Sequence, residues 1–265
     1  MKSDRVIYYS DPLEDDFAGL CISTREVGGD FPFVRGSGLW NLLAFLLYYL
    51  IAVPIVFLIS KCYLGLRVEH REALAELPAG GFFLYGNHTR YLDAFLPAVT
   101  AFPRKAYVVA NPDAVSIPFL KNLVLMLGVI PIPTKFDGMR SFLSTVTRRY
   151  AEGSCVAIFP EAHIWPFYTG IRPFQDTAFR YPVKENAPVI AMVTTYRRRT
   201  GLFRFLRKPA MTVTLSSPMY PRSDLSPKKA QEELRDRVYR FMSARAASPD
   251  NVEYIRYAPA AEKDP

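Results

Sequence analysis

The chain has 265 residues, of which half are hydrophobic and 14% aromatic, and its formal net charge is +8. This length accommodates one substantial domain with an appended segment. The three cysteines and three histidines lack the spacing of a disulfide framework or a zinc site, so we expect no metal and a reducing compartment. The basic balance favours anionic partners, either acidic lipid headgroups or an acidic carrier protein; no nucleic-acid motif accompanies it, so we expect no nucleic acid.

An apolar stretch follows a mixed N-terminal segment, residues 1–35, which lacks the apolar core of a cleavable signal peptide. Residues 36–60 carry no charge, and residues 39–59 contain one amide side chain, Asn41. As a helix these 21 positions would be roughly 30 Å long, about one hydrocarbon thickness. A core helix of a soluble protein rarely stays this apolar on all faces. We therefore predict a membrane-anchoring helix over residues 36–62.

Two placements of this helix remain open. It either spans the bilayer once or lies in the plane of the membrane with both ends on one side. Arg35 precedes it and Lys61, Arg67 and Arg71 follow it. The positive-inside tendency then favours a domain on the cytoplasmic face. In both placements the rest of the chain is held at the membrane surface, so we expect membrane lipids among its partners.

Downstream of the helix, short apolar runs alternate with helical patterns, which predicts an α/β domain over residues 63–247 with helices packed on a mixed central sheet. The polar residues 248–265 are expected to form a loosely ordered tail. The predicted strands are 81–86, 106–110, 128–132, 155–159, 188–195 and 210–215. The predicted helices are 91–98, 116–126, 138–151 and 227–246.

A histidine stands at the exit of the first predicted strand of this domain, in the run Asn87-His88 with Asp93 five positions after the histidine. On one continuous helix this spacing would put the two side chains on different faces. They converge if His88 lies in a turn and Asp93 on the helix that follows. The carboxylate would then orient the imidazole and favour its protonated form, which predicts a general base. The alternative is a structural histidine near a helix N-terminus.

A second acid ends another predicted buried strand, in the run Phe159-Pro160-Glu161. Ligands of open α/β sheets bind outside the carboxyl ends of strands. Two strand ends, one with His88 and one with Glu161, would therefore line one cleft. Taken alone, Glu161 also fits a helix cap or a surface acid.

Together these motifs resemble those of the glycerolipid (lysophospholipid) acyltransferase superfamily, which includes the 1-acylglycerol-3-phosphate acyltransferases. The family's N-H-x4-D motif matches Asn87, His88 and Asp93, and its F-P-E motif matches residues 159–161. Residues 128–132 and 187–191 are similar to its remaining two blocks. The resemblance extends over about residues 66–220, behind the apolar segment that is also common in the family.

The resemblance implies an acyltransferase that works without a cofactor. His88 would remove a proton from the hydroxyl or amine of a lipid acceptor, and Asp93 would orient His88. The acceptor would attack the thioester of acyl-CoA or acyl-carrier protein directly. The absence of a G-x-S-x-G nucleophile motif fits such a mechanism, because no acyl-enzyme is needed.

Two departures concern the positions where the family carries arginines associated with the acceptor's phosphate. The second block continues Pro133-Thr134-Lys135, with Thr134 or its neighbour in place of an arginine, and the third reads Ala162-His163-Ile164 in place of Gly-Thr-Arg. Neither threonine nor isoleucine can grip a phosphate. This favours an acceptor other than lysophosphatidate, such as another lysophospholipid or a lyso-aminolipid. As substrate-binding residues we assign Asn87, Arg90, Lys135, Pro160, Glu161 and Arg172.

A basic loop lies between the last two predicted strands, with arginines and one lysine around apolar side chains over residues 197–208. It favours contact with anionic lipid, and a solvated hairpin loop is the alternative. For the whole chain, two rivals of acyl transfer remain: a non-catalytic lipid-binding protein on the same fold, and a hydrolase in which water replaces the acceptor.

Overall fold

The structure is a computed structural model, and it describes residues 5–17, 25–117 and 119–262. Its centre is a seven-stranded mixed sheet with the strand order β2-β8-β7-β3-β6-β4-β5. Strands β7, β3, β6, β4 and β5 are mutually parallel, whereas β8 runs antiparallel to β7 and β2 runs parallel to β8. The predicted α/β class with a mixed sheet is confirmed.

The elements have the following bounds. The strands of the large sheet are β2 Arg67–Glu69, β3 Phe82–Gly86, β4 Ala106–Ala110, β5 Val129–Pro131, β6 Cys155–Ile158, β7 Val189–Arg197 and β8 Ala210–Leu215. The helices that follow the apolar one are α3 Leu96–Thr100, α4 Lys121–Met126, α5 Met139–Ala151, α6 Arg180–Glu185 and α7 Pro227–Ala246.

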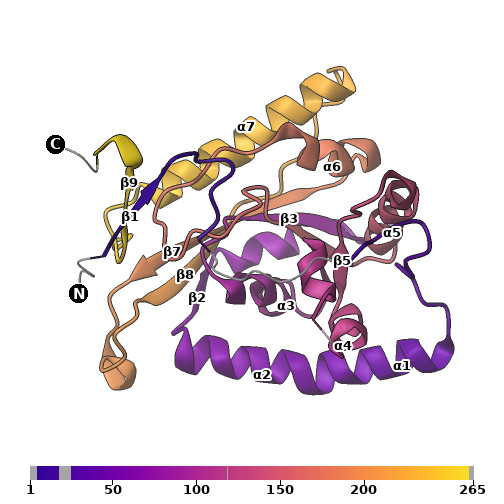
Figure 1. Cartoon of the computed structure of the whole chain (residues 1–265), viewed down its shortest axis with the longest axis horizontal. Helices are drawn as coiled ribbons and strands as arrows, with labels where there is room; N and C mark the ends of the chain where they lie inside the picture. Colours follow the sequence, from indigo (N-terminus) through magenta and orange to yellow (C-terminus); the bar gives the residue numbers. More distant parts are fainter. Residues whose placement is uncertain (1–4, 18–24, 118, 263–265) are drawn as a thin grey trace.

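Both faces of the sheet are covered, which explains why its strands read as continuous apolar runs. The side chains of strand β3 are divided between the two faces of the sheet, because successive side chains of a strand point in opposite directions. Phe82 and Leu84 belong to a core cluster with α3 and the apolar helix. Phe83 and Tyr85 belong to a second cluster with α5, α6 and α7. In Figure 1, α6 and α7 lie above the sheet and the apolar helix lies below it.

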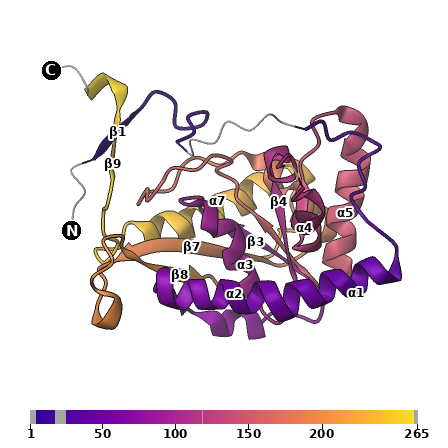
Figure 2. The same ribbon diagram turned by 60° about the horizontal axis from the view of Figure 1, so that its bottom comes forward.

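The predicted apolar helix is confirmed and extends over Gly38–Tyr63, including the segments labelled α1 (Gly38–Leu46) and α2 (Val53–Leu58). It runs along the outside of the domain instead of projecting from it (Figures 1 and 2), and it contacts α4 with α1 and α3 with α2. Tyr48 is 3% exposed, and its hydroxyl accepts a hydrogen bond of 2.9 Å from the Ala106 amide. One narrow face therefore binds the domain.

The two ends of the described chain pair with each other in a small parallel sheet of β1 (Val6–Tyr9) and β9 (Arg256–Pro259). Ile255 and Ala258 of the C-terminal segment are 5% and 3% exposed. Residues 248–262 thus differ from the loosely ordered tail that we expected. The pairing joins segments about 250 positions apart, and no local pattern reports such a partner.

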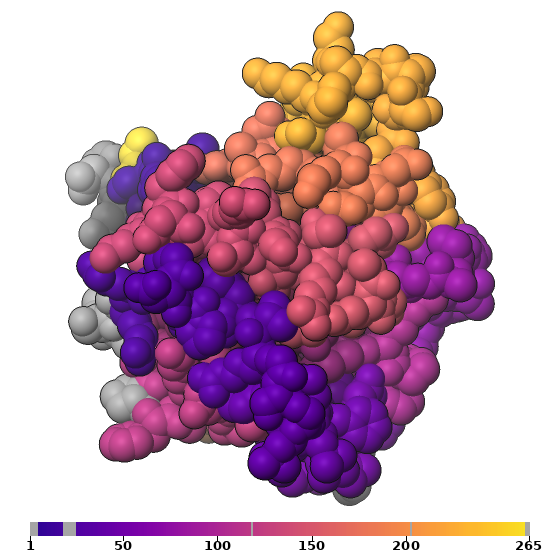
Figure 3. Space-filling view, turned by 90° about the vertical axis from the view of Figure 1, so that its right-hand side faces the viewer, coloured from indigo at the N-terminus to yellow at the C-terminus, as the bar shows by residue number. Residues whose placement is uncertain are grey.

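The N-terminal segment continues over residues 25–35 across the surface and packs against the loop after β5 (Figure 3). Val27 is fully buried, and its carbonyl accepts hydrogen bonds from the amides of Thr134 and Lys135. The Thr134 hydroxyl in turn accepts one from the Val27 amide at 2.8 Å. Thr134, which lies at or next to the position of the expected arginine, therefore anchors the N-terminal segment.

All six predicted strands are present, with ends shifted by up to two residues. The predicted helices over 138–151 and 227–246 are also present. The predicted helix over 91–98 is instead a 3-10 turn, Tyr91–Phe95, followed by α3, and only the second half of the one over 116–126 is the α-helix α4. Residue 118 lies outside the described residues. Strand β2 and helix α6 were not predicted.

Candidate active site

The candidate site begins where β3 ends, in the middle of the sheet. A Cβ on its last residue, Gly86, would lie 2.9 Å from side-chain atoms of both Met192 and Phe159, so close packing favours glycine there. The next residue, Asn87, is 1% exposed. Its Nδ2 donates to the Thr194 carbonyl at 3.0 Å, and its Oδ1 accepts from the Thr194 amide at 2.8 Å. The side chain thereby extends the pairing of β3 with β7 and fixes the start of the turn.

His88 follows in this turn, as predicted. Its ring lies against Phe159 at a centroid distance of 4.6 Å, and 15% of its side chain is exposed. Its backbone amide donates to Glu161 Oε2 at 3.1 Å. Its Nδ1 lies 3.6 Å from Asp93 Oδ2 and has no hydrogen-bond partner among the described residues. The turn therefore brings one imidazole nitrogen to a carboxylate.

Asp93 is fully buried in the 3-10 turn after His88, and its Oδ2 is held by three donors. These are the amides of Thr89 at 2.6 Å and Arg90 at 2.7 Å, and the Thr89 hydroxyl at 3.2 Å. The Thr89 hydroxyl also bonds the buried Tyr196 hydroxyl at 2.6 Å. The 3.6 Å to the imidazole exceeds a hydrogen bond, but such contacts are commonly long before a substrate is bound. The carboxylate is pre-positioned beside the ring.

Glu161 lies at the carboxyl end of β6, which is the neighbour of β3, and it is 4% exposed. Besides the His88 amide, it accepts the Arg172 amide at 3.1 Å, and Arg172 Nε lies 3.6 Å from Oε2. Burial raises the pKa of Glu161, and the charge of Arg172 opposes this rise. Burial also lowers the pKa of Arg172, against the charge of Glu161. The two side chains form a buried pair that holds the backbone of His88.

Arg172 makes most of its contacts inside the domain, although its buried Nε has no hydrogen-bond partner among the described residues. It is 2% exposed, its Nη2 donates to the carbonyls of Glu161 and His163, and its guanidinium lies 5.1 Å from the ring centroid of Trp165. Its Nη1 donates to the Pro12 carbonyl at 3.5 Å. The structure thus places this predicted substrate-binding residue behind the site, as a support for Glu161.

The remaining predicted site residues are more dispersed. Pro160 is buried beside Glu161. Arg90 lies under the turn, with its guanidinium 4.9 Å from the ring centroid of Phe167. Lys135 follows β5, which is three strands from β3 and therefore about 14 Å away across the sheet. Its Nζ pairs with Glu26 Oε2 at 2.6 Å. No described contact joins Lys135 to the others.

Two residues of the candidate site were missed by the sequence reasoning, namely Thr89 and Tyr196. Thr89 sits inside the N-H-x4-D motif at a position that the motif leaves open, and only the structure shows the contact of its hydroxyl with Asp93. Tyr196 is 107 positions away on β7, and no local signal connects it with the turn.

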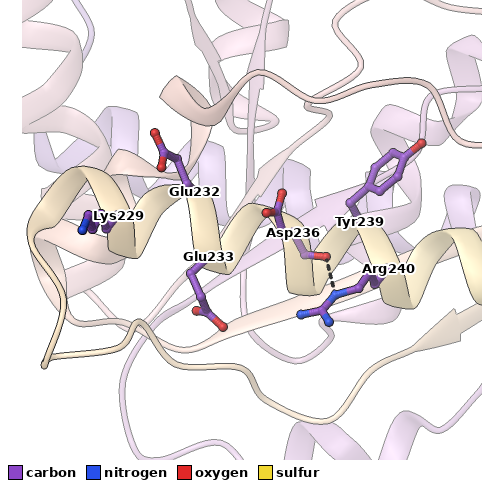
Figure 4. A pocket seen from close by; sticks show the side chains of 6 residues that line it. All are labelled: Lys229, Glu232, Glu233, Asp236, Tyr239 and Arg240. Carbon is purple, nitrogen blue, oxygen red and sulfur yellow. Dashed lines mark hydrogen bonds between the residues drawn. The ribbon is translucent and has the colours of Figure 1, made fainter.

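No group of His, Cys, Asp and Glu within the described ranges could hold a metal ion. An open hollow lies on α7, lined by Lys229, Glu232, Glu233, Asp236, Tyr239 and Arg240 (Figure 4). Arg240 Nε donates to the Asp236 carbonyl there at 3.3 Å. For the part of the chain that the structure describes, none of these side chains bonds His88, Asp93 or Glu161. The hollow is therefore separate from the candidate site in the turn after β3.

Comparisons with known proteins identify the domain that contains this turn. Residues 65–195 match the family model described as acyltransferase, and this range contains β3, β6 and all of the buried cluster except Tyr196. Residues 65–195 are therefore an acyltransferase domain, and the chain is an enzyme of that class. No curated protein sequence matches it.

A solved structure with a similar fold is that of the 1-acyl-sn-glycerophosphate (LPA) acyltransferase PlsC from Thermotoga maritima. The TM-score is 0.53 with 16% sequence identity, over 82% of this chain and 91% of that one. At this identity the likeness concerns the fold.

Proposed function

We propose that this protein is a membrane-attached acyltransferase that moves a fatty acyl group from acyl-CoA or acyl-carrier protein to a lysophospholipid or another lipid acceptor. The observation that carries the proposal is the pair of His88 and the buried Asp93, with Nδ1 and Oδ2 3.6 Å apart, at the end of the central strand of an acyltransferase domain. The fold resemblance to an LPA acyltransferase supports a lipid acceptor.

In the proposed reaction, His88 Nε2 takes the proton from the acceptor hydroxyl or amine. The acceptor oxygen or nitrogen forms a bond to the thioester carbonyl carbon, and the C–S bond of the donor breaks. The proton on the imidazolium passes to the departing thiolate, which leaves as a free thiol. Atoms and charge balance without an acyl-enzyme. Asp93 stabilises the imidazolium while it exists, because its carboxylate lies on the Nδ1 side of the ring.

The role of Glu161 in this proposal is to hold the base instead of the substrate. Its Oε2 accepts the His88 amide, which fixes the backbone of the turn, while Arg172 and Trp165 support the loop behind it. A base that is held by buried groups loses little conformational entropy when the acceptor binds.

We further propose that the apolar helix lies in the plane of the membrane. Its outer face exposes eleven large apolar side chains, and most of the helix is not buried against the domain. These side chains are Leu39, Leu42, Leu43, Phe45, Leu46, Leu50, Ile51, Ile55, Phe57, Leu58 and Ile59. Contacts with the domain in both halves of the helix argue against a perpendicular span. Attachment at the cytoplasmic face remains a prediction from the flanking charges.

The test is thiol release from acyl-CoA and from acyl-carrier protein, measured with the purified protein and a panel of lysolipids. We expect release that depends on an acceptor and that falls about 10²- to 10⁴-fold in His88→Ala. His70→Ala, a change at an exposed histidine, serves as the matched control. Release that does not need an acceptor would identify a hydrolase. No release with either donor and any acceptor would identify a non-catalytic lipid-binding protein.

A further inference from the structure

Arg90, two residues after the proposed base, is a buried cation without an acidic partner. The residue is 9% exposed, and no carboxylate among the described residues pairs with its guanidinium. Within the described ranges its side chain makes one hydrogen bond, to a weak acceptor, Met211 Sδ, at 3.6 Å. Burying a charge is costly unless it is paired and hydrogen-bonded. An arginine in such a place indicates a ligand that supplies the missing anion.

The surroundings of Arg90 hold the guanidinium but leave its donors free. The rings of Phe167 and Tyr63 lie 4.9 Å and 5.9 Å from it. Cation–π contacts of this kind stabilise the charge, but they do not use the planar N–H donors that grip an oxyanion. None of the Arg90 nitrogens is both buried and unpaired, so the unpaired N–H groups of the guanidinium are accessible to solvent.

A second guanidinium, that of Arg199, lies next to the same tyrosine. Its Nη2 donates to the Tyr63 carbonyl, and its Nε donates to the Lys208 carbonyl at 2.7 Å. Gly65 has a φ of 59°, and a Cβ there would lie 3.1 Å from Arg199 Nη1. Burial, and then the positive charge of Arg90, lower the pKa of Arg199. Two arginines are therefore held near each other against their repulsion.

These hydrogen bonds also give Arg199 a structural role, because it binds the carbonyl at the end of the apolar helix. That role explains the position of one arginine but not the burial of Arg90, which donates to no main-chain carbonyl in the described part of the chain. An anion between the two would offset both the lost hydration and the repulsion.

The place of this arginine pair suggests where its ligand comes from. The pair lies where the turn after β3, here called the catalytic turn, meets the end of the apolar helix and the loop between β7 and β8. In Figures 1 and 2 this loop lies beside the end of α2. Arg204, Arg207 and Lys208 of this loop are exposed, and Phe205 is 70% exposed. Basic and aromatic side chains beside an apolar helix are typical of contact with anionic lipid.

We propose that Arg90 and Arg199 form a binding site for the phosphate of a phospholipid headgroup that enters from the membrane beside the catalytic turn. The buried position of Arg90 admits a small oxyanion, whereas a protein or nucleic-acid surface would reach only the exposed loop. The inference rests on the proposed membrane attachment for the direction of entry, and it does not depend on the proposed chemistry at His88.

The test is calorimetric titration of the full-length protein in detergent with dihexanoyl phosphatidylglycerol below its micelle concentration. Dihexanoylglycerol, which lacks the phosphate, and coenzyme A, a phosphate source of the donor type, form the other arms. We expect binding of the phospholipid that weakens with salt, about 10- to 100-fold weaker binding by Arg90→Met, and an intermediate loss for Arg90→Lys, which keeps the charge without the fork.

Two controls separate this site from other effects. Arg240→Met, at an exposed arginine on α7, should leave binding unchanged. His88→Ala should also leave binding unchanged, so a failure of the proposed chemistry would not affect the result. The melting temperature of Arg90→Met should be equal to or above that of the wild type, because an unpaired buried charge is removed. A purely structural arginine would instead lower it.

Three results would overturn the proposal. The first is phospholipid binding that both Arg90 variants leave unchanged. The second is equal affinity for dihexanoylglycerol, which would show that no phosphate is recognised. The third is displacement of the phospholipid by coenzyme A through Arg90, which would assign the arginine pair to the acyl donor.

Discussion

The buried pair of Glu161 and Arg172 offers the sharpest test of how the catalytic turn is held, through the change Glu161→Gln. The amide is nearly isosteric, but it presents one acceptor where the carboxylate accepts the amides of both His88 and Arg172. One buried donor then faces an NH2 group, and Arg172 loses its only ion-pair partner within the described ranges. Loss of a buried hydrogen bond costs about 1–3 kcal/mol, and removal of one partner of a buried pair about 3–5 kcal/mol.

These two costs overlap, so we expect the free energy of unfolding to fall by about 3–5 kcal/mol. For a domain of this size each kcal/mol corresponds to about 2–4 °C, which predicts a melting temperature lower by about 6–20 °C. Turnover per folded molecule should fall as well, because the backbone of His88 loses its anchor. Thermal unfolding in detergent and thiol release measured well below the transition check the two effects.

The matched control is Glu76→Gln, the same change at an exposed acid, which should alter stability by less than about 0.5 kcal/mol. The reasoning would be refuted if Glu161→Gln melted like the wild type and only raised the KM for the acceptor. Glu161 would then contact substrate, and the turn would not depend on it.

Further changes test other parts of the same framework. Thr89→Val removes the hydroxyl between Asp93 and Tyr196, and we expect kcat to fall about tenfold with little change in KM; an unchanged kcat would remove Thr89 from the positioning of the pair. Tyr48→Phe leaves the buried Ala106 amide without its acceptor and should cost about 1–3 kcal/mol in chemical denaturation, whereas wild-type stability would show that this contact does not attach the helix. Burial lowers the pKa of Lys105 to about 8, so the unfolded state binds more protons between pH 8 and 10.5 and stability should rise with pH there. Comparison of the wild type with Lys105→Met isolates this contribution, up to about 3 kcal/mol, and identical pH profiles would contradict it.

Much of the fold could be predicted because it rests on local patterns. Strands of a sheet covered on both faces read as apolar runs, and the long helices α5 and α7 show their buried stripes at helical spacing. Strand β2 has only three residues, two of them charged, and joins the sheet solely through its long-range partner β8. Strands β1 and β9 likewise exist through each other, which is why the C-terminal segment was mistaken for a loose tail.

The candidate site was predicted in part for a similar reason. The N-H-x4-D and F-P-E motifs lie at the ends of strands, and parallel neighbours β3 and β6 bring such ends together. The side chains assigned to substrate were less predictable, since an arginine in a sequence does not say what surrounds it. Arg172 proves to be buried beside Glu161, and Lys135 proves to be paired with Glu26 far along the sheet.

The sequence by itself determined the apolar helix, the class of fold and the two residues proposed for proton transfer, because periodicity and short motifs are local properties. Only the tertiary structure decided how these parts meet. It laid the helix along the domain and connected Tyr196 to Asp93 through the Thr89 hydroxyl. It also set Arg90 and Arg199 against the same residue, Tyr63, with no acidic side chain of the described residues paired to Arg90. Each of these depends on contacts between segments that are tens to more than a hundred positions apart, and such contacts arise only when the sheet brings the segments together.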